Sequence, residues 1–338
     1  MQIRRSELVK RNLPINFNQL DQNLFEKEFE KEFEEVNSEL LKRLYILSNG
    51  VCFKNSILFD LYIRNFNIGF KNRIKLTIKT LLVFVSSFNT IKINKAILIT
   101  DHFSAGFFHW FGDVLQKLEA LDIIKPDLSG YVFLVPEDFA SASSLNSLKV
   151  YDIDYKIIGK NHKILADQLL VIPELAPSGN YRPELMQNMR NRFKEFYNII
   201  PKQKRIFITR SKALKRTIIN EDKLLQILQK FNFDVVAMEE ISFDEQYKCI
   251  AESNVLVSLH GAGLTHMLWL EKNSKVLEIR AKEDLLNNCF YSLASALKLK
   301  YYYILADKTN KKSTQLTDFI VDPLQFEGLI TQIIEKNK

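Results

Sequence analysis

The stretch Val255–Leu270, VLVSLHGAGLTHMLWL, decides the fold that we predict for this chain. It begins with an apolar run that is typical of a buried strand, and residues 264–270 have the apolar content of a buried helix. Between them, His260 to Gly263 contain two glycines, which allow a tight turn and close approach to the backbone. A helix that begins there directs free N–H groups at an anion, so the turn predicts a phosphate site. An ordinary strand-to-helix turn is the alternative.

Length and composition indicate a folded protein of about two domains. The 338 residues exceed the usual size of a single hydrophobic core. Hydrophobic residues make up 46% and charged residues 26%, which is typical of globular proteins. The net charge of +7 is spread along the chain among acidic residues and forms no basic stripe. We therefore expect no nucleic-acid partner.

The cysteines and the apolar runs indicate the cellular compartment of the protein. Cys52, Cys249 and Cys289 are odd in number and lack CxxC spacing, which argues against a disulfide framework and a zinc site. No apolar run approaches the roughly 20 residues that cross a membrane. The first residues, MQIRRSELVKRNLPINF, lack the apolar core of a signal peptide. We expect a cytoplasmic protein.

From about residue 95, short apolar strands alternate with helices, which predicts an α/β fold with parallel sheets. The Pro- and Gly-rich stretch Pro173–Pro183 is the linker candidate. We predict one α/β domain over residues 1–180, a second over 181–310, and a tail helix over 311–338 that packs back toward the first domain. The expected strands are Lys95–Thr100, Tyr131–Val135, Tyr155–Ile158, Ile164–Ile172, Lys204–Thr209, Phe233–Met238, Asn254–Leu259, Lys275–Ile279 and Lys300–Leu305; the expected helices are Phe107–Leu121, Phe139–Leu148, Glu184–Tyr197, Asn220–Phe231, Phe243–Ser253, Gly263–Leu270 and Asp284–Leu299.

The residues before 95 carry two local signals. Phe25–Leu47 has phenylalanines at helical spacing with Glu and Lys between them, which predicts one amphipathic helix; a partner-binding element is the alternative. Asn49-Gly50 stands between two apolar runs and predicts a hairpin.

Charged residues follow two other predicted strands of the second half. The strand RIFITR ends at Arg210, and Arg216 follows in the same basic loop. Basic residues at a strand end are suited to a diphosphate, because the planar guanidinium matches phosphate oxygens. A solvated basic loop is the alternative. Glu278 closes the strand KVLEI, where a carboxylate accepts hydrogen bonds from ribose hydroxyls or pairs with Arg280 or a lysine.

In the first half, the informative stretch is residues 101–113, DHFSAGFFHWFGD. His109 and Asp113 are four residues apart and share one helical face, so the pair is a candidate general base, with Asp101 as another candidate. A core histidine in an aromatic helix is the alternative. The histidines lack the HExxH spacing, and the DxD pair Asp152/Asp154 precedes a strand, so we expect no metal site.

The blocks RIFITRSKALKRTIINEDKLLQIL, FDVVAMEEISFDEQYKCIAESNVLVSLHGAGLTHMLWL and KVLEI, together with HWFGDVLQKLEAL, resemble glycosyltransferase family 61. The resemblance runs from about Lys95 to Ile279. It implies a GT-B architecture, in which two Rossmann-like domains face each other across a cleft and the second holds a nucleotide sugar. Where many relatives have asparagine after the HGAGLT run, this chain has His266, which leaves its role open. The donor and phosphate site that we predict comprises Arg210, Arg216, His260, Gly261, Ala262, Gly263, Leu264, Thr265 and Glu278.

The resemblance implies transfer of a sugar from a nucleoside-diphosphate sugar to a hydroxyl of a glycan or lipid-linked glycan, with inversion and without a cofactor or a divalent metal. His109, Asp113 or Asp101 would take the acceptor proton. We expect a bacterial cytoplasmic enzyme of capsule or lipopolysaccharide synthesis, which would contact the inner membrane face through Ile63–Lys79. A surface helix or loop is the alternative for that segment. Two alternatives for the function are a polysaccharide pyruvyl-type transferase and an inactive carbohydrate- or nucleotide-binding relative.

Overall fold

The chain forms two compact units in the computed structural model. Residues 1–54, 57–58, 78, 81–101, 103–213, 216–282, 284–310 and 313–335 are described. Unit 1 consists of Met1–Glu7 and Phe33–Ser178, and unit 2 consists of Leu8–Glu32 and Gly179–Lys338. Residues 8–32 thus belong to unit 2, which differs from the single domain that we predicted over 1–180. Both units are α/β, as predicted, whereas the GT-B arrangement of the two stays a prediction.

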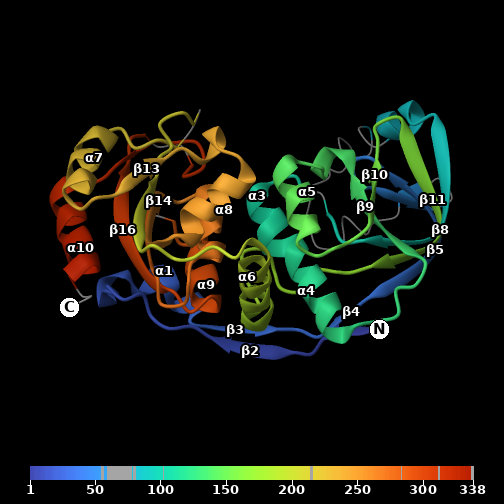
Figure 1. Ribbon diagram of the computed structural model, residues 1–338, viewed down its shortest axis with the longest axis horizontal. Coiled ribbons are helices and arrows are strands. Elements are labelled where there is room, and N and C mark those ends of the chain that lie inside the picture. Colours follow the sequence, from blue (N-terminus) through green and yellow to red (C-terminus); the bar gives the residue numbers. More distant parts are fainter. Residues whose placement is uncertain are drawn as a thin grey trace. The chain divides into compact units, whose positions relative to one another are not determined.

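Unit 1 is built on a seven-stranded sheet with the order β10-β9-β8-β11-β5-β6-β7. The first four strands are parallel, and β5, β6 and β7 continue the sheet in antiparallel pairs. Helices α3, α4 and α5 lie on the same side of these strands (Figure 1). The elements are β1 (Gln2–Arg4), β4 (Val36–Asn37), β5 (Glu39–Leu47), β6 (Cys52–Lys54), β7 (Ile57–Leu58), β8 (Asn89–Leu98), α3 (Phe107–His109), a π-helical turn (Trp110–Val114), α4 (Leu115–Ile124), β9 (Tyr131–Pro136), a 3₁₀ turn (Glu137–Phe139), α5 (Ala142–Lys149), β10 (Tyr155–Ile158) and β11 (His162–Val171).

Unit 2 is built on a six-stranded sheet with the order β13-β12-β14-β15-β16-β17. The first five strands are parallel and β17 is antiparallel. Helices α7 and α10 lie on one side of this sheet, and α6, α8 and α9 lie on the other (Figure 1). The elements are α6 (Pro183–Tyr197), β12 (Lys204–Ile208), α7 (Glu221–Lys230), β13 (Asp234–Val236), a 3₁₀ turn (Met238–Glu240), α8 (Phe243–Ala251), β14 (Ser253–Leu259), η6 (Ala262–Trp269), β15 (Lys275–Ala281), α9 (Cys289–Ala296), β16 (Lys300–Lys308), β17 (Phe319–Ile320) and α10 (Pro323–Glu335).

The predicted helix over Phe25–Leu47 is wrong. Short helical turns at Gln19–Asp21, Gln22–Phe25 and Glu26–Glu28 are followed by β3 (Glu30–Phe33), which pairs with β2 (Glu7–Lys10), and then by β4 and β5. A spacing of four residues fits the helix period of 3.6 and is also an even number, so it places the same side chains on one face of a strand. The phenylalanine spacing therefore did not distinguish the two structures.

The tail helix α10 packs within unit 2, which differs from the predicted packing toward the first domain. Its buried residues Phe326, Ile330 and Ile333 join a core that also contains Leu224 and Leu228 of α7. Apolar residues at three- and four-residue spacing make this helix bury one face, but the spacing alone does not say against what.

Two further observations concern the membrane prediction. Residues 63–77 and 79 of the segment that we expected at a membrane lie outside the described residues. Within the described part of the chain, no helix combines the length and the apolar character that crossing a membrane needs.

The hairpin predicted at Asn49-Gly50 is confirmed. β5 and β6 pair in antiparallel register with Ile46 opposite Cys52, and the Gly50 N–H donates to the carbonyl oxygen of Leu47 at 2.9 Å. Gly50 has φ +78°, a left-handed conformation that costs residues with a side chain more than it costs glycine.

We expect Gly50→Ala to lower the free energy of unfolding by about 1 kcal/mol, because alanine is strained at this φ. Gly328→Ala is the matched control, since Gly328 lies within α10 with no atom near the position of an added Cβ. This control should raise stability by roughly 0.5–1 kcal/mol. Urea denaturation measures both, and an equal effect of the two substitutions would contradict the prediction.

Candidate functional site

The strand order of unit 2 reverses between β12 and β14. The chain runs from β12 to β13 on one side and then returns to β14 on the other side. In open parallel sheets, ligands bind beyond the carboxyl ends of the strands at such a point. Arg210 follows β12 and His260 follows β14, so the fold places both predicted donor residues at this position.

Arg210 and Arg216 meet beside Gly261. A Cβ built on Gly261 would lie 3.1 Å from Nη1 of Arg210 and 3.6 Å from Nη2 of Arg216. Nε of Arg210 donates to the carbonyl oxygen of Arg216 at 3.0 Å, so the backbone of Arg216 holds the side chain of Arg210. Burial lowers the pKa of both guanidinium groups, and the charge of Arg210 lowers the pKa of Arg216 further. Two half-buried cations this close favour an anion between them.

The glycine turn leads into the predicted helix, which is a 3₁₀ helix, η6. Gly263 lies against β12, because a Cβ there would be 3.2 Å from Cγ2 of Ile208. Among the described residues no side chain caps the first turn of η6, and Ala262 is exposed. Leu264 and Thr265 are fully buried, so contacts of their side chains with a donor are not compatible with the structure. Of the predicted residues 261–265, Gly261, Ala262 and Gly263 stay candidates for donor binding, through their backbone groups.

Glu278 is buried behind His260 and not exposed toward a ligand. Its carboxylate contacts Nδ1 of His260 and accepts a hydrogen bond from the Tyr301 hydroxyl at 2.6 Å. Because Glu278 has no exposed surface, the structure does not support the predicted direct contact with a ribose, which corrects that expectation. Burial raises the pKa of Glu278, but His260, Arg280 and Tyr301 together outweigh burial and hold it below its usual value. An ionised carboxylate therefore orients the imidazole of His260, whose other nitrogen, Nε2, is left for a ligand.

His266 lies in the core and does not join the arginine pair. Its side chain is buried, and burial alone lowers its pKa to about 3, so the imidazole is neutral at physiological pH. The role that the sequence left open is therefore a structural one.

The sheet of unit 1 has the same kind of reversal, between β8 and β11. Its parallel strands follow the order β10-β9-β8-β11, so β8 has its successor β9 on one side and the last parallel strand on the other. Asp101 follows β8, and Glu174 and Ser178 follow β11. Sequence reasoning did not name Glu174 or Ser178, because they lie in the stretch that it assigned to a linker.

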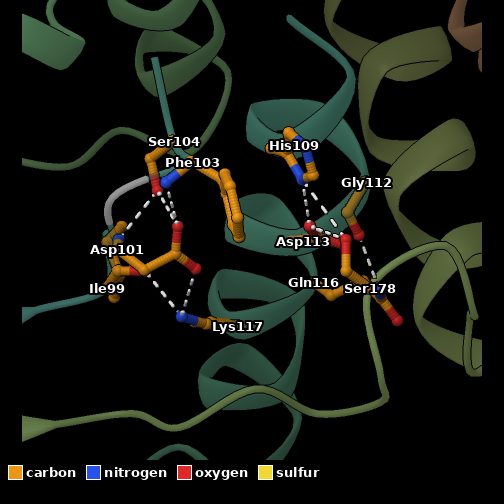
Figure 2. Close-up of polar contacts among 10 residues, drawn as sticks. All are labelled: Ile99, Asp101, Phe103, Ser104, His109, Gly112, Asp113, Gln116, Lys117 and Ser178. Carbon is orange, nitrogen blue, oxygen red and sulfur yellow. Dashed lines mark hydrogen bonds and ion pairs between the residues drawn. The ribbon is translucent and has the colours of Figure 1, made fainter. Parts of the chain in front are cut away.

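His109 and Asp113 form the predicted pair, and Ser178 joins them. Nδ1 of His109 lies 2.8 Å from Oδ2 of Asp113, and the Ser178 hydroxyl donates to the same oxygen at 2.8 Å (Figure 2). The Phe103 ring stacks on the imidazole with centroids 5.0 Å apart. Because Nδ1 faces the carboxylate, Nε2 of His109 is the nitrogen that can accept a proton.

Asp101 has a different environment. Its carboxylate accepts from the Phe103 N–H at 2.9 Å and from the Ser104 hydroxyl at 3.1 Å, and Nζ of Lys117 lies 4.0 Å away (Figure 2). Lys117 is buried and donates to the Ile99 carbonyl oxygen at 2.9 Å. Through these contacts Asp101 holds Phe103 and Ser104 in place after β8. His109 is therefore the better candidate for the base.

Two further features mark this part of unit 1. The helix that carries His109 and Asp113 contains a π-helical turn at Trp110–Val114, a distortion that is frequent at functional sites. Burial raises the pKa of Glu174; the charge of Lys117 opposes this shift, and those of Asp101 and Asp113 add to it. Perturbed carboxyl groups of this kind cluster at functional sites.

Comparison with known proteins gives the family. The family model described as Glycosyltransferase 61 matches residues 107–277, a little over half of the chain, so the protein belongs to this family. The matched region contains His109 and Asp113 of unit 1, and Arg210, Arg216 and the His260–Gly263 turn of unit 2.

Curated relatives are similar to shorter parts of the chain. The EGF domain-specific O-linked N-acetylglucosamine transferase of Drosophila melanogaster is 35% identical over 106 residues, which is 30% of this chain and 20% of that protein. The corresponding protein of Gallus gallus is 32% identical over 101 residues, 28% of this chain and 18% of that protein. Protein O-linked-mannose beta-1,4-N-acetylglucosaminyltransferase 2 of Xenopus laevis is 36% identical over 72 residues, 20% of this chain and 12% of that protein. These matches span a fifth or less of the relatives.

The pKa of His266 gives a testable pH dependence. Its folded pKa of about 3 lies below the ordinary 6.5, so the stability that its neutral form allows is present above pH 6.5 and is lost as the pH falls toward 3. We expect His266→Gln to lose less thermal stability than the parent protein between pH 7 and pH 4.5. His162→Gln, at a partly exposed histidine of unit 1, is the control. Equal pH profiles of His266→Gln and the parent protein would contradict this.

Proposed function

We propose that the protein transfers a sugar from a nucleoside-diphosphate sugar to a hydroxyl group. Membership of the glycosyltransferase 61 family supports the reaction class. The observation that carries the donor is the pair Arg210 and Arg216 beside Gly261, at the strand-order reversal of unit 2. Diphosphate is the part of the donor that such a pair recognises, because each guanidinium offers two parallel N–H groups to phosphate oxygens.

The reaction assigns the two clusters different tasks. The acceptor oxygen forms a bond to the anomeric carbon while the bond from that carbon to the diphosphate oxygen breaks. The diphosphate leaves with the electron pair, and the arginine pair with the backbone of the glycine turn stabilises its charge. The proton of the acceptor hydroxyl goes to Nε2 of His109, whose Nδ1 is held by Asp113. Attack opposite the leaving group inverts the anomeric carbon, and no step uses a metal or a cofactor.

We propose N-acetylglucosamine as the first sugar to test, because the names of the relatives from Drosophila melanogaster and Xenopus laevis both contain it. Our first proposal for the acceptor is a hydroxyl of a glycan or lipid-linked glycan. This glycan would belong to a surface polysaccharide that is synthesised in the cytoplasm. A protein hydroxyl is the second candidate, because the name of the Drosophila melanogaster relative contains the words EGF domain-specific and O-linked. Incubation of one radiolabelled donor with both acceptor classes distinguishes them.

We expect Arg210→Ala and Arg216→Ala each to weaken binding of UDP-N-acetylglucosamine and of UDP about 10–100-fold, because a charge-assisted hydrogen bond to phosphate is lost. Arg210→Lys keeps the charge without the planar fork and should lie between. Lys223→Ala removes an exposed charge from α7 of the same unit and is the control. Isothermal titration calorimetry measures the affinities, and unchanged donor affinity in both alanine variants would remove the arginine pair from the site.

We expect His109→Gln to lower kcat about 10²–10⁴-fold, because the group that takes the acceptor proton is lost. Ser178→Ala should lower kcat by a smaller factor, since Asp113 still holds the imidazole. Donor affinity should stay at the value of the parent protein in both variants. Ser6→Ala, at an exposed residue of unit 1, is the control for Ser178→Ala. A His109→Gln variant with full turnover would exclude His109 as the base.

A further inference from the structure

Residues Leu8–Glu32, which we name the N-terminal brace, contact β16 of unit 2 through their middle part, from Ile15 to Phe25. The Ile15 N–H donates to the carbonyl oxygen of Tyr301 at 2.8 Å. The Asn16 side chain binds both backbone groups of Tyr303, donating to its carbonyl oxygen at 2.7 Å and accepting from its N–H at 3.2 Å. The hydroxyl of Tyr303 in turn donates to Asp21 at 2.6 Å. The brace is therefore attached to the strand that carries Tyr301.

Phe25 is the centre of the contact between the brace and the sheet. Its side chain is fully buried, and the rings of Tyr291, Tyr301 and Tyr303 meet it edge-on with centroids 5.2, 6.4 and 4.9 Å away. The guanidinium carbon of Arg280 lies 5.1 Å from the centre of the same ring, in the geometry of a cation–π contact.

A second path joins the brace to Arg280. The Leu24 carbonyl oxygen accepts a hydrogen bond from the Asn288 amide at 2.7 Å, and the amide oxygen of Asn288 accepts from Nη1 of Arg280 at 2.8 Å. Nη2 of Arg280 donates to the carbonyl oxygen of Asp284 at 2.7 Å. The brace thus touches Arg280 through an aromatic ring and through an amide.

The contacts of Phe25 continue through neighbouring side chains to the proposed donor site. Arg280 and Glu278 are two residues apart on β15, so their side chains leave the same face of the strand. Tyr301 contacts the Phe25 ring and donates its hydroxyl to Glu278, and Glu278 binds Nδ1 of His260. A continuous set of contacts therefore runs from Phe25 to the imidazole beside the Gly261 turn.

We infer that the N-terminal brace sets the orientation of His260 for donor binding, with Phe25 and Tyr301 as positioning residues that act through Glu278. This inference rests on the proposed donor site. Phe25, Tyr301 and Arg280 lie outside the part of the chain that matches the family, residues 107–277. The brace and its contacts with these residues therefore lie outside the region that matches the family.

The charged groups around Glu278 support this positioning role. The titratable and charged groups that act on Glu278 or are acted on by it are His260 after β14, Arg280 on β15, Tyr301 on β16 and Cys289 on α9. A buried carboxylate stays ionised only while such partners compensate for its lost hydration. Removal of the Tyr301 hydroxyl takes away one of the contacts that lower the pKa of Glu278. Protonation of Glu278 would then weaken its hold on His260.

Two pairs of variants of the full chain test the inference. Tyr301→Phe deletes only the hydroxyl, and Tyr302→Phe is its control on the next residue of the same strand, where the side chain is also buried but faces the other side of the sheet. Phe25→Leu reduces a fully buried ring, and Phe326→Leu does the same in α10. The readouts are ¹⁵N–¹H spectra of the imidazole groups without ligand, with His260 identified from His260→Gln, and calorimetric titration with UDP and with GDP.

We expect Tyr301→Phe and Phe25→Leu to change the His260 imidazole signals and to weaken UDP binding about tenfold, the effect of losing one hydrogen bond at the site. The Tyr302→Phe and Phe326→Leu controls should keep both properties at a similar melting temperature. Unchanged His260 signals in Tyr301→Phe and Phe25→Leu would overturn the inference. If neither UDP nor GDP binds the parent protein, the proposed donor site fails, and the spectra still decide whether the brace positions His260.

Discussion

The order of the strands is the constraint on which the candidate site depends. In each unit one parallel strand has its successor on one side and a later strand on the other, so the segments that leave the two carboxyl ends diverge. In unit 2 these segments bring Arg210 and Arg216 against Gly261. In unit 1 they bring Ser178 against Asp113. Residues far apart in sequence become neighbours because the segments that carry them leave the sheet at the carboxyl ends of adjacent strands.

A buried charge connects the candidate donor site to the rest of unit 2. Taking the Glu278 carboxylate out of water is unfavourable, and the structure compensates with His260, Tyr301 and Arg280. Each of these partners is itself held by a further group, so the compensation extends to Phe25 in the N-terminal segment. The surroundings of one desolvated carboxylate thus include a segment that is distant in sequence.

Three histidines show how the surroundings decide chemistry. His109 and His260 both direct Nδ1 at a carboxylate, which leaves Nε2 for a proton or a ligand. The carboxylate of His109 is shared with an exposed serine, Ser178, whereas that of His260 is fully buried. His266 lies only six residues after His260 but is buried and neutral. The same side chain therefore serves as a base candidate, a ligand candidate and a packing residue.

The sequence by itself determined the α/β class, the hairpin at Asn49-Gly50, and the clustering of candidate residues after strands, because periodicity and glycine chemistry are local properties. It also identified His109 with Asp113, since a four-residue spacing in a helix is short-range information. Only the tertiary structure decided that Phe25 lies in a helical turn of unit 2 and contacts Tyr301, and that the buried Glu278 faces His260. These contacts join residues that no periodic pattern relates, because burial and strand order are set by the packing of the whole chain.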